Sequence, residues 1–217
     1  MEEVLAAYEQ PLRAAEPVIC LDERPVQLTA DTRPASRVRP GRAARYDYEY
    51  QRHGTANLFC AVEPKAGWHL VRATPNRTGP EFAKVIRAIL GHFPAADTVH
   101  LVMDNLSTHT RKALTDYYGE AIGGALWDRL TVHYTPKHAS WLNQAEISIG
   151  LLLRECLGRR RIADLPMLRR ETAAWQRRAN RDRRIIQWRF TQRKARKLFG
   201  SRRPSRAPHQ SRQSRCH

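Results

Sequence analysis

The chain has 217 residues, enough for one sizeable domain with a real hydrophobic core, and its 41% hydrophobic content excludes wholesale disorder. The net charge of +17 lies entirely in residues 151–217, which hold 21 basic and 4 acidic side chains. This asymmetry favours a nucleic-acid partner over a basic face that only keeps the protein soluble.

The first half of the chain predicts a three-strand antiparallel meander after a short helix. The expected elements are a helix over residues 2–15 and strands over 17–28, 45–64 and 67–75. Arginines and helix or strand breakers predict a basic loop over residues 29–45. Tyr46, Tyr48 and Tyr50 alternate with charged residues, which favours a half-buried strand face over a base-stacking surface.

The pattern changes period in the second half. The expected elements are strands over residues 97–104 and 128–136, and helices over 79–94, 110–120, 142–158 and 164–180. Residues 200–217 contain Arg, Ser and Pro with almost no apolar side chain, so we expect a disordered basic tail. The order of elements predicts an α/β fold with a mixed five-stranded sheet, a meander plus parallel strands, flanked by helices.

The cysteines and the N-terminus predict a cytoplasmic protein. Cys20, Cys60, Cys156 and Cys216 are far apart and lack the paired spacing of a zinc site. Cys20 and Cys60 lie in apolar strand-like runs, so we expect buried free thiols. The acidic N-terminus has no long apolar stretch, and no segment approaches the roughly 18 apolar residues that span a bilayer.

Three acids stand in apolar surroundings. Asp22 interrupts a strand, Asp104 ends one, and Glu146 lies in an apolar helix. A buried carboxylate needs a partner, and a divalent cation shared by all three would supply it. Other readings stay open at this point: Asp104 could cap the next helix, Asp22 could pair with an arginine, and Glu146 could face solvent. Glu23 points to the other face of its strand, which indicates a structural role.

Three segments resemble the signature blocks of the bacterial insertion-sequence transposases related to mariner, the DDE superfamily endonucleases. They are "VICLDERPVQL", "HLVMDNLSTHT" and "HYTPKHASWLNQAEI", and the resemblance covers roughly residues 17–198. It implies a ribonuclease H-like fold in which Asp22, Asp104 and Glu146 are the catalytic acids. It also implies that these acids bind Mg²⁺ or Mn²⁺, with two ions in the site.

The resemblance implies further site residues. Asn105, His109, Trp141 and Asn143 fall in the second and third blocks, where they are expected to orient the carboxylates and fix the helix. Trp141 is expected in the core rather than stacked on a base. Basic residues expected to contact DNA are Lys137, His138, Arg159, Arg160, Arg161, Arg177 and Arg178.

The domain organisation departs from the family in two respects. We expect an N-terminal helical segment over residues 1–16, a catalytic domain over 17–199 and the tail over 200–217. Family members carry a helix-turn-helix DNA-binding region before the catalytic domain, and only 21 residues precede Asp22 here. The 41 residues between Asp104 and Glu146 exceed the mariner spacing, and the excess is expected as an extended loop over residues 119–130.

The expected function is metal-dependent cleavage of double-stranded DNA at an element end, followed by strand transfer to target DNA. The resemblance also implies self-association as a dimer and a nucleoid-associated bacterial protein. Two alternatives stay open: a non-catalytic basic protein that binds nucleic acid, and an inactive remnant of a transposase.

Overall fold

The computed structural model describes residues 1–33, 36, 40–41, 48–158 and 160–200, and its centre is one mixed sheet. The strands are β1 (Val18–Asp31), β2 (Tyr50–Glu63), β3 (Trp68–Thr74), β4 (Val99–Met103) and β5 (Leu130–Tyr134). Their order is β3-β2-β1-β4-β5. β1, β2 and β3 form an antiparallel meander, and β4 and β5 run parallel to β1. The predicted five-stranded mixed sheet is confirmed.

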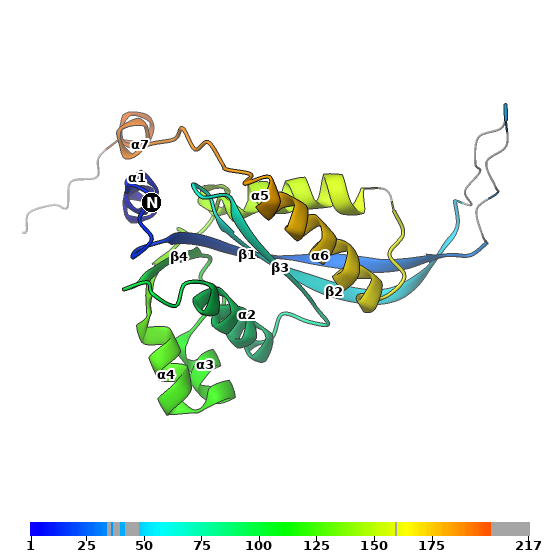
Figure 1. The fold of residues 1–217 in the computed structure, drawn as a ribbon. Coiled ribbons are helices and arrows are strands. Elements are labelled where there is room, and N and C mark those ends of the chain that lie inside the picture. The colour runs from blue at the N-terminus through cyan, green and yellow to red at the C-terminus, as the bar shows by residue number, and fades with distance from the viewer. Residues whose placement is uncertain (34–35, 37–39, 42–47, 159, 201–217) are drawn as a thin grey trace, which may run out of the picture.

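Helices cover both faces of this sheet (Figure 1). They are α1 (Glu2–Glu9), α2 (Gly79–His92), α3 (Arg111–Tyr118), α4 (Glu120–Asp128), α5 (Ala145–Leu152), α6 (Leu165–Arg181) and α7 (Gln192–Phe199). A 3₁₀ turn, η1 (Ser140–Leu142), precedes α5, and a π-helical turn, η2 (Leu153–Leu157), follows it. α2, α3 and α4 lie on one face, and α5 and α6 lie on the other (Figure 1). None of the helices in the described part of the chain is long and apolar enough to cross a membrane.

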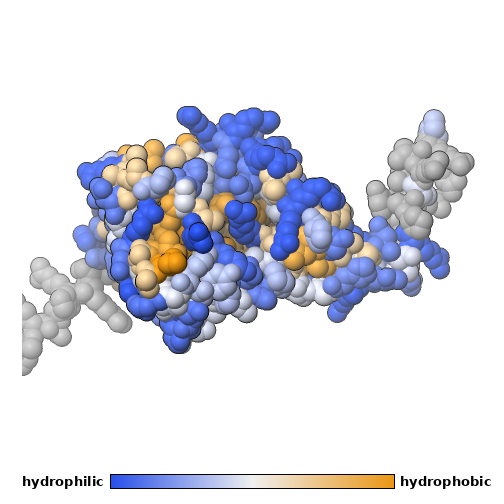
Figure 2. All heavy atoms as spheres, turned by 60° about the horizontal axis from the view of Figure 1, so that its bottom comes forward, coloured by the Kyte–Doolittle hydropathy of each residue, from blue (hydrophilic) through white to orange (hydrophobic). Residues whose placement is uncertain are grey.

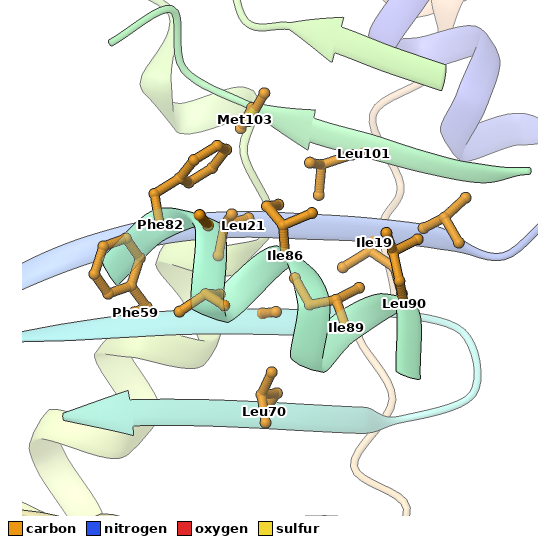
Figure 3. Close-up of a cluster of buried hydrophobic side chains, with 14 of the residues drawn as sticks. Ile19, Leu21, Phe59, Leu70, Phe82, Ile86, Ile89, Leu90, Leu101 and Met103 are labelled. Carbon is orange, nitrogen blue, oxygen red and sulfur yellow. The ribbon is translucent and has the colours of Figure 1, made fainter. Parts of the chain in front are cut away.

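Side-chain alternation along the central strands builds two cores. Phe59 and Ala61 of β2 point to the α2 face, while Leu58 and Cys60 point to the α5 and α6 face. On the first face α2 contributes a buried stripe at helical spacing, which packs on β1 and β4 (Figure 3). Burial of each such large side chain contributes about 1.5–3 kcal/mol. Packed side chains therefore hold the sheet from both sides.

The N-terminal helix packs onto the same body. Val4, Leu5 and Tyr8 of α1 share a buried cluster with residues of β1, β4 and α7. The Tyr8 hydroxyl donates a hydrogen bond to the main-chain oxygen of Leu142 at 2.8 Å. Cys20 is buried in this cluster, as predicted. α1 thus supports the turn that leads into α5.

Two predicted boundaries are wrong in detail, and one helix was not predicted. The N-terminal helix ends at Glu9 rather than at residue 15, because Pro11 cannot continue it. β1 runs on to Asp31, into the predicted basic loop. α7 had no counterpart among the predicted helices, because its eight residues carry five charges or amides and only a short apolar side. The predicted tail lies outside the described residues, apart from Gly200.

The predicted extended loop over residues 119–130 is also wrong, because most of this segment forms α4. Gly119 turns the chain with φ of 81° between α3 and α4. Gly123 lets the two helices touch, since a Cβ atom there would lie 2.4 Å from the main-chain oxygen of Leu114. The glycines that suggested a loop instead permit close helix packing.

The expected half-buried tyrosine face is not formed. Tyr48 precedes β2 and is 87% exposed, and Tyr50 is also exposed, while Tyr46 lies outside the described residues.

Figure 2 shows the molecule from the side on which α2, α3 and α4 lie, with hydrophilic side chains around separate apolar patches. Exposed apolar residues of α3 and α4 include Tyr117 and Ile122.

Candidate active site

The three acids predicted to be catalytic line one pocket of about 170 Å³. Asp22 lies within β1, and Asp104 directly follows β4. β1 and β4 are parallel neighbours that pair Cys20 with Val102, so two further residues along each strand bring these acids side by side. Glu146 is the second residue of α5, where the helix dipole favours a negative charge. The pocket thus lies at the carboxyl ends of the parallel strands.

Asp22 is the most perturbed of the three acids. Its Oδ1 accepts the main-chain N–H of Glu23 at 2.8 Å, and its Oδ2 accepts from Asn143 Nδ2 at 3.3 Å. Burial raises the pKa of Asp22 to about 7, and the charges of Glu146 and Asp104 add to the rise. The contributions of Glu146 and Asp104 show that both carboxylates lie close to Asp22.

Asp104 is held by a buried histidine. His109 Nδ1 lies 2.8 Å from Asp104 Oδ1 and 3.1 Å from the main-chain oxygen of Asp104. His109 Nε2 lies 2.5 Å from Glu23 Oε1. Burial alone would lower the pKa of His109, but the contacts with Asp104 and Glu23 outweigh it and raise this pKa to about 9. The contact with the His109 imidazole in turn lowers the pKa of the Asp104 carboxyl.

Glu23, Asp104 and His109 also form a cluster whose ligand atoms lie within 4.8 Å of one another. We interpret it as a hydrogen-bonded chain rather than a metal site. Two ligand atoms at right angles on one ion, each about 2.1 Å away, lie about 3 Å apart. The 2.5 Å between His109 Nε2 and Glu23 Oε1 is shorter than that, so these two atoms contact each other directly, as a hydrogen-bond donor and its acceptor do.

The pocket suits hard divalent cations. Its wall carries the carboxylates of Asp22, Asp104 and Glu146, and oxygen ligands are those that Mg²⁺ prefers. The raised pKa of Asp22 indicates negative charge that a bound cation would neutralise. Arg77 also lines the pocket, where its positive charge faces the acids and helps to lower the pKa of Asp104.

The contacts of the three acids bear on the alternative roles that the sequence left open for them. Asp104 does not cap the next helix, since Thr110 caps α3 and accepts the N–H of Ala113. Asp22 has Asn143 and the Glu23 main chain as its hydrogen-bond partners. Glu146 is exposed, as a helix face in solvent would be, and it borders the pocket.

The four expected support residues separate into two groups. His109 and Asn143 are buried and hydrogen-bond next to the acids, whereas Asn105 is exposed and does not line the pocket. Trp141 was expected in the core, and this is wrong, because the residue is 46% exposed. Its ring lies edge-on to the ring of Phe190, with ring centroids 5.2 Å apart. η1 turns Trp141 outward while Leu142 points inward, so only one of these neighbours is buried.

None of the described residues expected to contact DNA lines the pocket. Lys137 and His138 are exposed in the loop before η1. Arg160 pairs with Glu171 at 2.9 Å, and Arg161 pairs with Asp31 at 2.6 Å. The remaining two described residues of this set, Arg177 and Arg178, are exposed on α6. Arg159 lies outside the described residues.

Sequence reasoning missed several residues of the pocket wall. They are Glu23, Arg77, Thr135 and Ser140. Glu23 was assigned a structural role because it alternates with Asp22, and it does point to the α2 face, where it contacts His109. Arg77 lies in the loop between β3 and α2, far from the acids in sequence. The signal for Ser140 was its position in the third signature block.

Comparison with known proteins identifies the family. A sequence profile of the DDE superfamily endonucleases matches residues 17–169. The chain therefore belongs to the DDE superfamily endonucleases. No curated protein matches the chain at a significant level.

Solved structures of the Mos1 mariner transposase share the fold. The Mos1 mariner paired end complex with Mn has a TM-score of 0.52 at 16% identity, covering 83% of this chain and 55% of that chain. The Mos1 complex with Mg has a TM-score of 0.52 at 16% identity, and the match covers 85% of this chain and 54% of that chain. The Mos1 strand transfer complex has a TM-score of 0.51 at 15% identity, and the match covers 81% of this chain and 51% of that chain. The chain thus spans about half the length of these chains, and the expected ribonuclease H-like fold is confirmed.

Proposed function

We propose that the chain is the catalytic core of a transposase that cuts double-stranded DNA at an element end and joins the freed 3′-hydroxyl to target DNA. The observation that carries the proposal is the pocket that Asp22, Asp104 and Glu146 line in a chain of this family. The Mos1 structures named above include paired end complexes with Mn and with Mg and a strand transfer complex. These complexes support the same metals and the same class of substrate here.

Each acid has a defined role in this proposal. Asp22, Asp104 and Glu146 would hold one or two Mg²⁺ or Mn²⁺ ions, which when bound activate the attacking oxygen and stabilise the leaving oxygen. Asn143 orients Asp22, and His109 orients Asp104. Arg77 is placed to contact a phosphate oxygen of the DNA strand.

The reaction consists of two phosphoryl transfers. In the first, a water oxygen bonds to phosphorus as the bond to the 3′-oxygen breaks, which leaves a 3′-hydroxyl and a 5′-phosphate. In the second, that hydroxyl attacks a phosphodiester of target DNA and displaces a 3′-oxygen there. Joining two ends requires two sites, so we include self-association of the chain in the proposal.

A cleavage assay tests the proposal. Labelled duplexes that carry the ends of the encoding element, and scrambled duplexes, are incubated with the protein and Mg²⁺, Mn²⁺ or EDTA. We expect metal-dependent strand cleavage that Asp104→Asn lowers at least about 100-fold. Glu63→Gln is the matched control, because Glu63 is a buried acid of β2 outside the pocket wall.

The same assay separates the alternatives. A protein that only binds nucleic acid would retain both duplexes on a gel without cutting them in any metal. An inactive remnant would bind the metal and the DNA and still leave the strands intact. Cleavage by Asp104→Asn at the wild-type rate would contradict the assignment of the site.

A further inference from the structure

Glu23 lines the candidate metal pocket, and one histidine joins it to Asp104. The imidazole of His109 lies between two acids, with Nε2 2.5 Å from Glu23 Oε1 and Nδ1 2.8 Å from Asp104 Oδ1. The His109 side chain is 0% exposed and the Glu23 side chain is 3% exposed. Water therefore has little access to either group, and loss of this contact would leave a buried polar group without its partner.

The imidazole is also fixed by groups that are not acids. The Phe82 ring of α2 stacks on it, with ring centroids 4.7 Å apart and planes at 28°. The Tyr134 hydroxyl of β5 donates a hydrogen bond to the main-chain oxygen of His109 at 2.9 Å. Residues from β1, α2 and β5 thus determine where the imidazole lies.

Asp104 needs such support more than Asp22 does. It follows the last residue of β4, where ladder hydrogen bonds end, and its side chain is 44% exposed. Asp22 instead lies within β1 and is held by Asn143. A half-exposed carboxylate beyond a strand end can rotate about χ1 and χ2 unless a neighbour holds one oxygen.

We propose that Glu23 is a positioning residue, which acts through His109 to hold the Asp104 carboxylate in the orientation that binds a divalent cation. The inference rests on the proposed function, because it concerns the same site. In this proposal Glu23 acts through His109 and not as a ligand, because its Oε1 contacts His109 Nε2. Carboxylates that bind metals are commonly oriented by such outer partners, and loss of one typically lowers metal affinity about 10–100-fold.

Direct Mn²⁺ binding tests this proposal without DNA and without turnover. The signal of free Mn²⁺ in electron paramagnetic resonance is titrated with wild type, Glu23→Leu and Glu23→Gln. We expect Glu23→Leu to weaken Mn²⁺ binding by about 10–100-fold. Glu23→Gln should lose less, since its Oε1 can still accept the hydrogen bond from His109. Wild-type affinity in Glu23→Leu would overturn the proposal.

A matched variant excludes a merely structural effect. Glu63→Leu removes another buried acid, which lies on β2 and accepts the main-chain N–H of Ala66. Thermal unfolding is recorded for both Leu variants. We expect both to unfold at lower temperature, with Mn²⁺ affinity lost only in Glu23→Leu. Equal loss of affinity in both variants would overturn the proposal.

A double-mutant cycle with His109→Asn separates positioning from direct ligation. If Glu23 acts through His109, Glu23→Leu should weaken Mn²⁺ binding little further once His109 is replaced. A further loss as large as in the wild-type background would make Glu23 a ligand and overturn the proposal. Wild type that binds Mn²⁺ but does not cut DNA would contradict only the proposed function. Wild type without Mn²⁺ affinity would contradict both.

Discussion

The amide of Asn143 joins the start of α5 to β1. Its Nδ2 donates to the main-chain oxygen of Leu21 at 2.8 Å and to Asp22 Oδ2 at 3.3 Å, while its Oδ1 accepts the N–H of Ala145 at 3.2 Å. The residue is 1% exposed. One buried side chain therefore ties the helix that carries Glu146 to the strand that carries Asp22, and helps to set the distance between these two acids.

Replacement of Asn143 should destabilise the protein. Asn143→Ala leaves the main-chain oxygen of Leu21 buried without its donor, so we expect a loss of about 1–3 kcal/mol in the free energy of unfolding. Asn105→Ala is the matched control, because Asn105 is exposed and should change stability by less than about 0.5 kcal/mol. Urea unfolding with EDTA measures both, and equal losses would contradict the assigned contacts.

The stability of the metal-free protein should depend on the protonation of Asp22. The pKa of Asp22 is raised from 3.8 to about 7 in the folded chain by burial and by the neighbouring acids. The folded state therefore binds more protons than the unfolded state between these values. The stabilising contribution is present below about pH 4 and is lost as the pH rises through about 7.

Asp22→Asn removes this dependence because the amide stays neutral. In EDTA the variant should match wild type at about pH 4 and be more stable at about pH 8. Urea unfolding across this range gives the difference in free energy of unfolding. A difference that stays constant with pH would contradict the shifted pKa of Asp22.

Close contact between α3 and α4 makes Gly123 irreplaceable. A Cβ atom there would lie 2.4 Å from the main-chain oxygen of Leu114, so Gly123→Ala should cost about 1–3 kcal/mol. Gly150 in α5 is the matched control, since a Cβ atom there meets nothing within 4 Å. Gly150→Ala should stabilise by about 0.5–1 kcal/mol. A lower midpoint of thermal unfolding for Gly123→Ala and a higher one for Gly150→Ala would confirm the packing.

The sheet was predictable because each strand has a local signal. β4 is an apolar run that ends at Asp104, and β1 is interrupted by Asp22, so both strand and acid could be found from sequence. The glycines of α4 misled the prediction, because a residue without Cβ serves a loop and a close helix contact equally well. Periodicity could not show whether Trp141 or Leu142 faces inward in a turn of three residues.

Contacts between distant segments could not be predicted either. The approach of Glu23 to His109 joins residues 86 positions apart, and it depends on the pairing of β1 with β4. Arg161 was expected to contact DNA on the basis of local charge. In the structure its guanidinium pairs with Asp31 and donates a hydrogen bond to the main-chain oxygen of Glu49, so it also links the segment before α6 to β1.

Arg77 should contribute directly to DNA affinity. Its guanidinium is exposed and lines the acidic pocket, where a phosphate would be its natural partner. Arg77→Ala should therefore weaken duplex binding and make the dependence of log affinity on log salt shallower by about 0.9. Arg161→Ala is the control: its ion pair with Asp31 predicts lower thermal stability and an unchanged salt slope. Fluorescence anisotropy of a labelled duplex across a salt series measures both slopes. If Arg161→Ala changes the slope and Arg77→Ala does not, the phosphate contact belongs to the segment before α6 instead of the pocket.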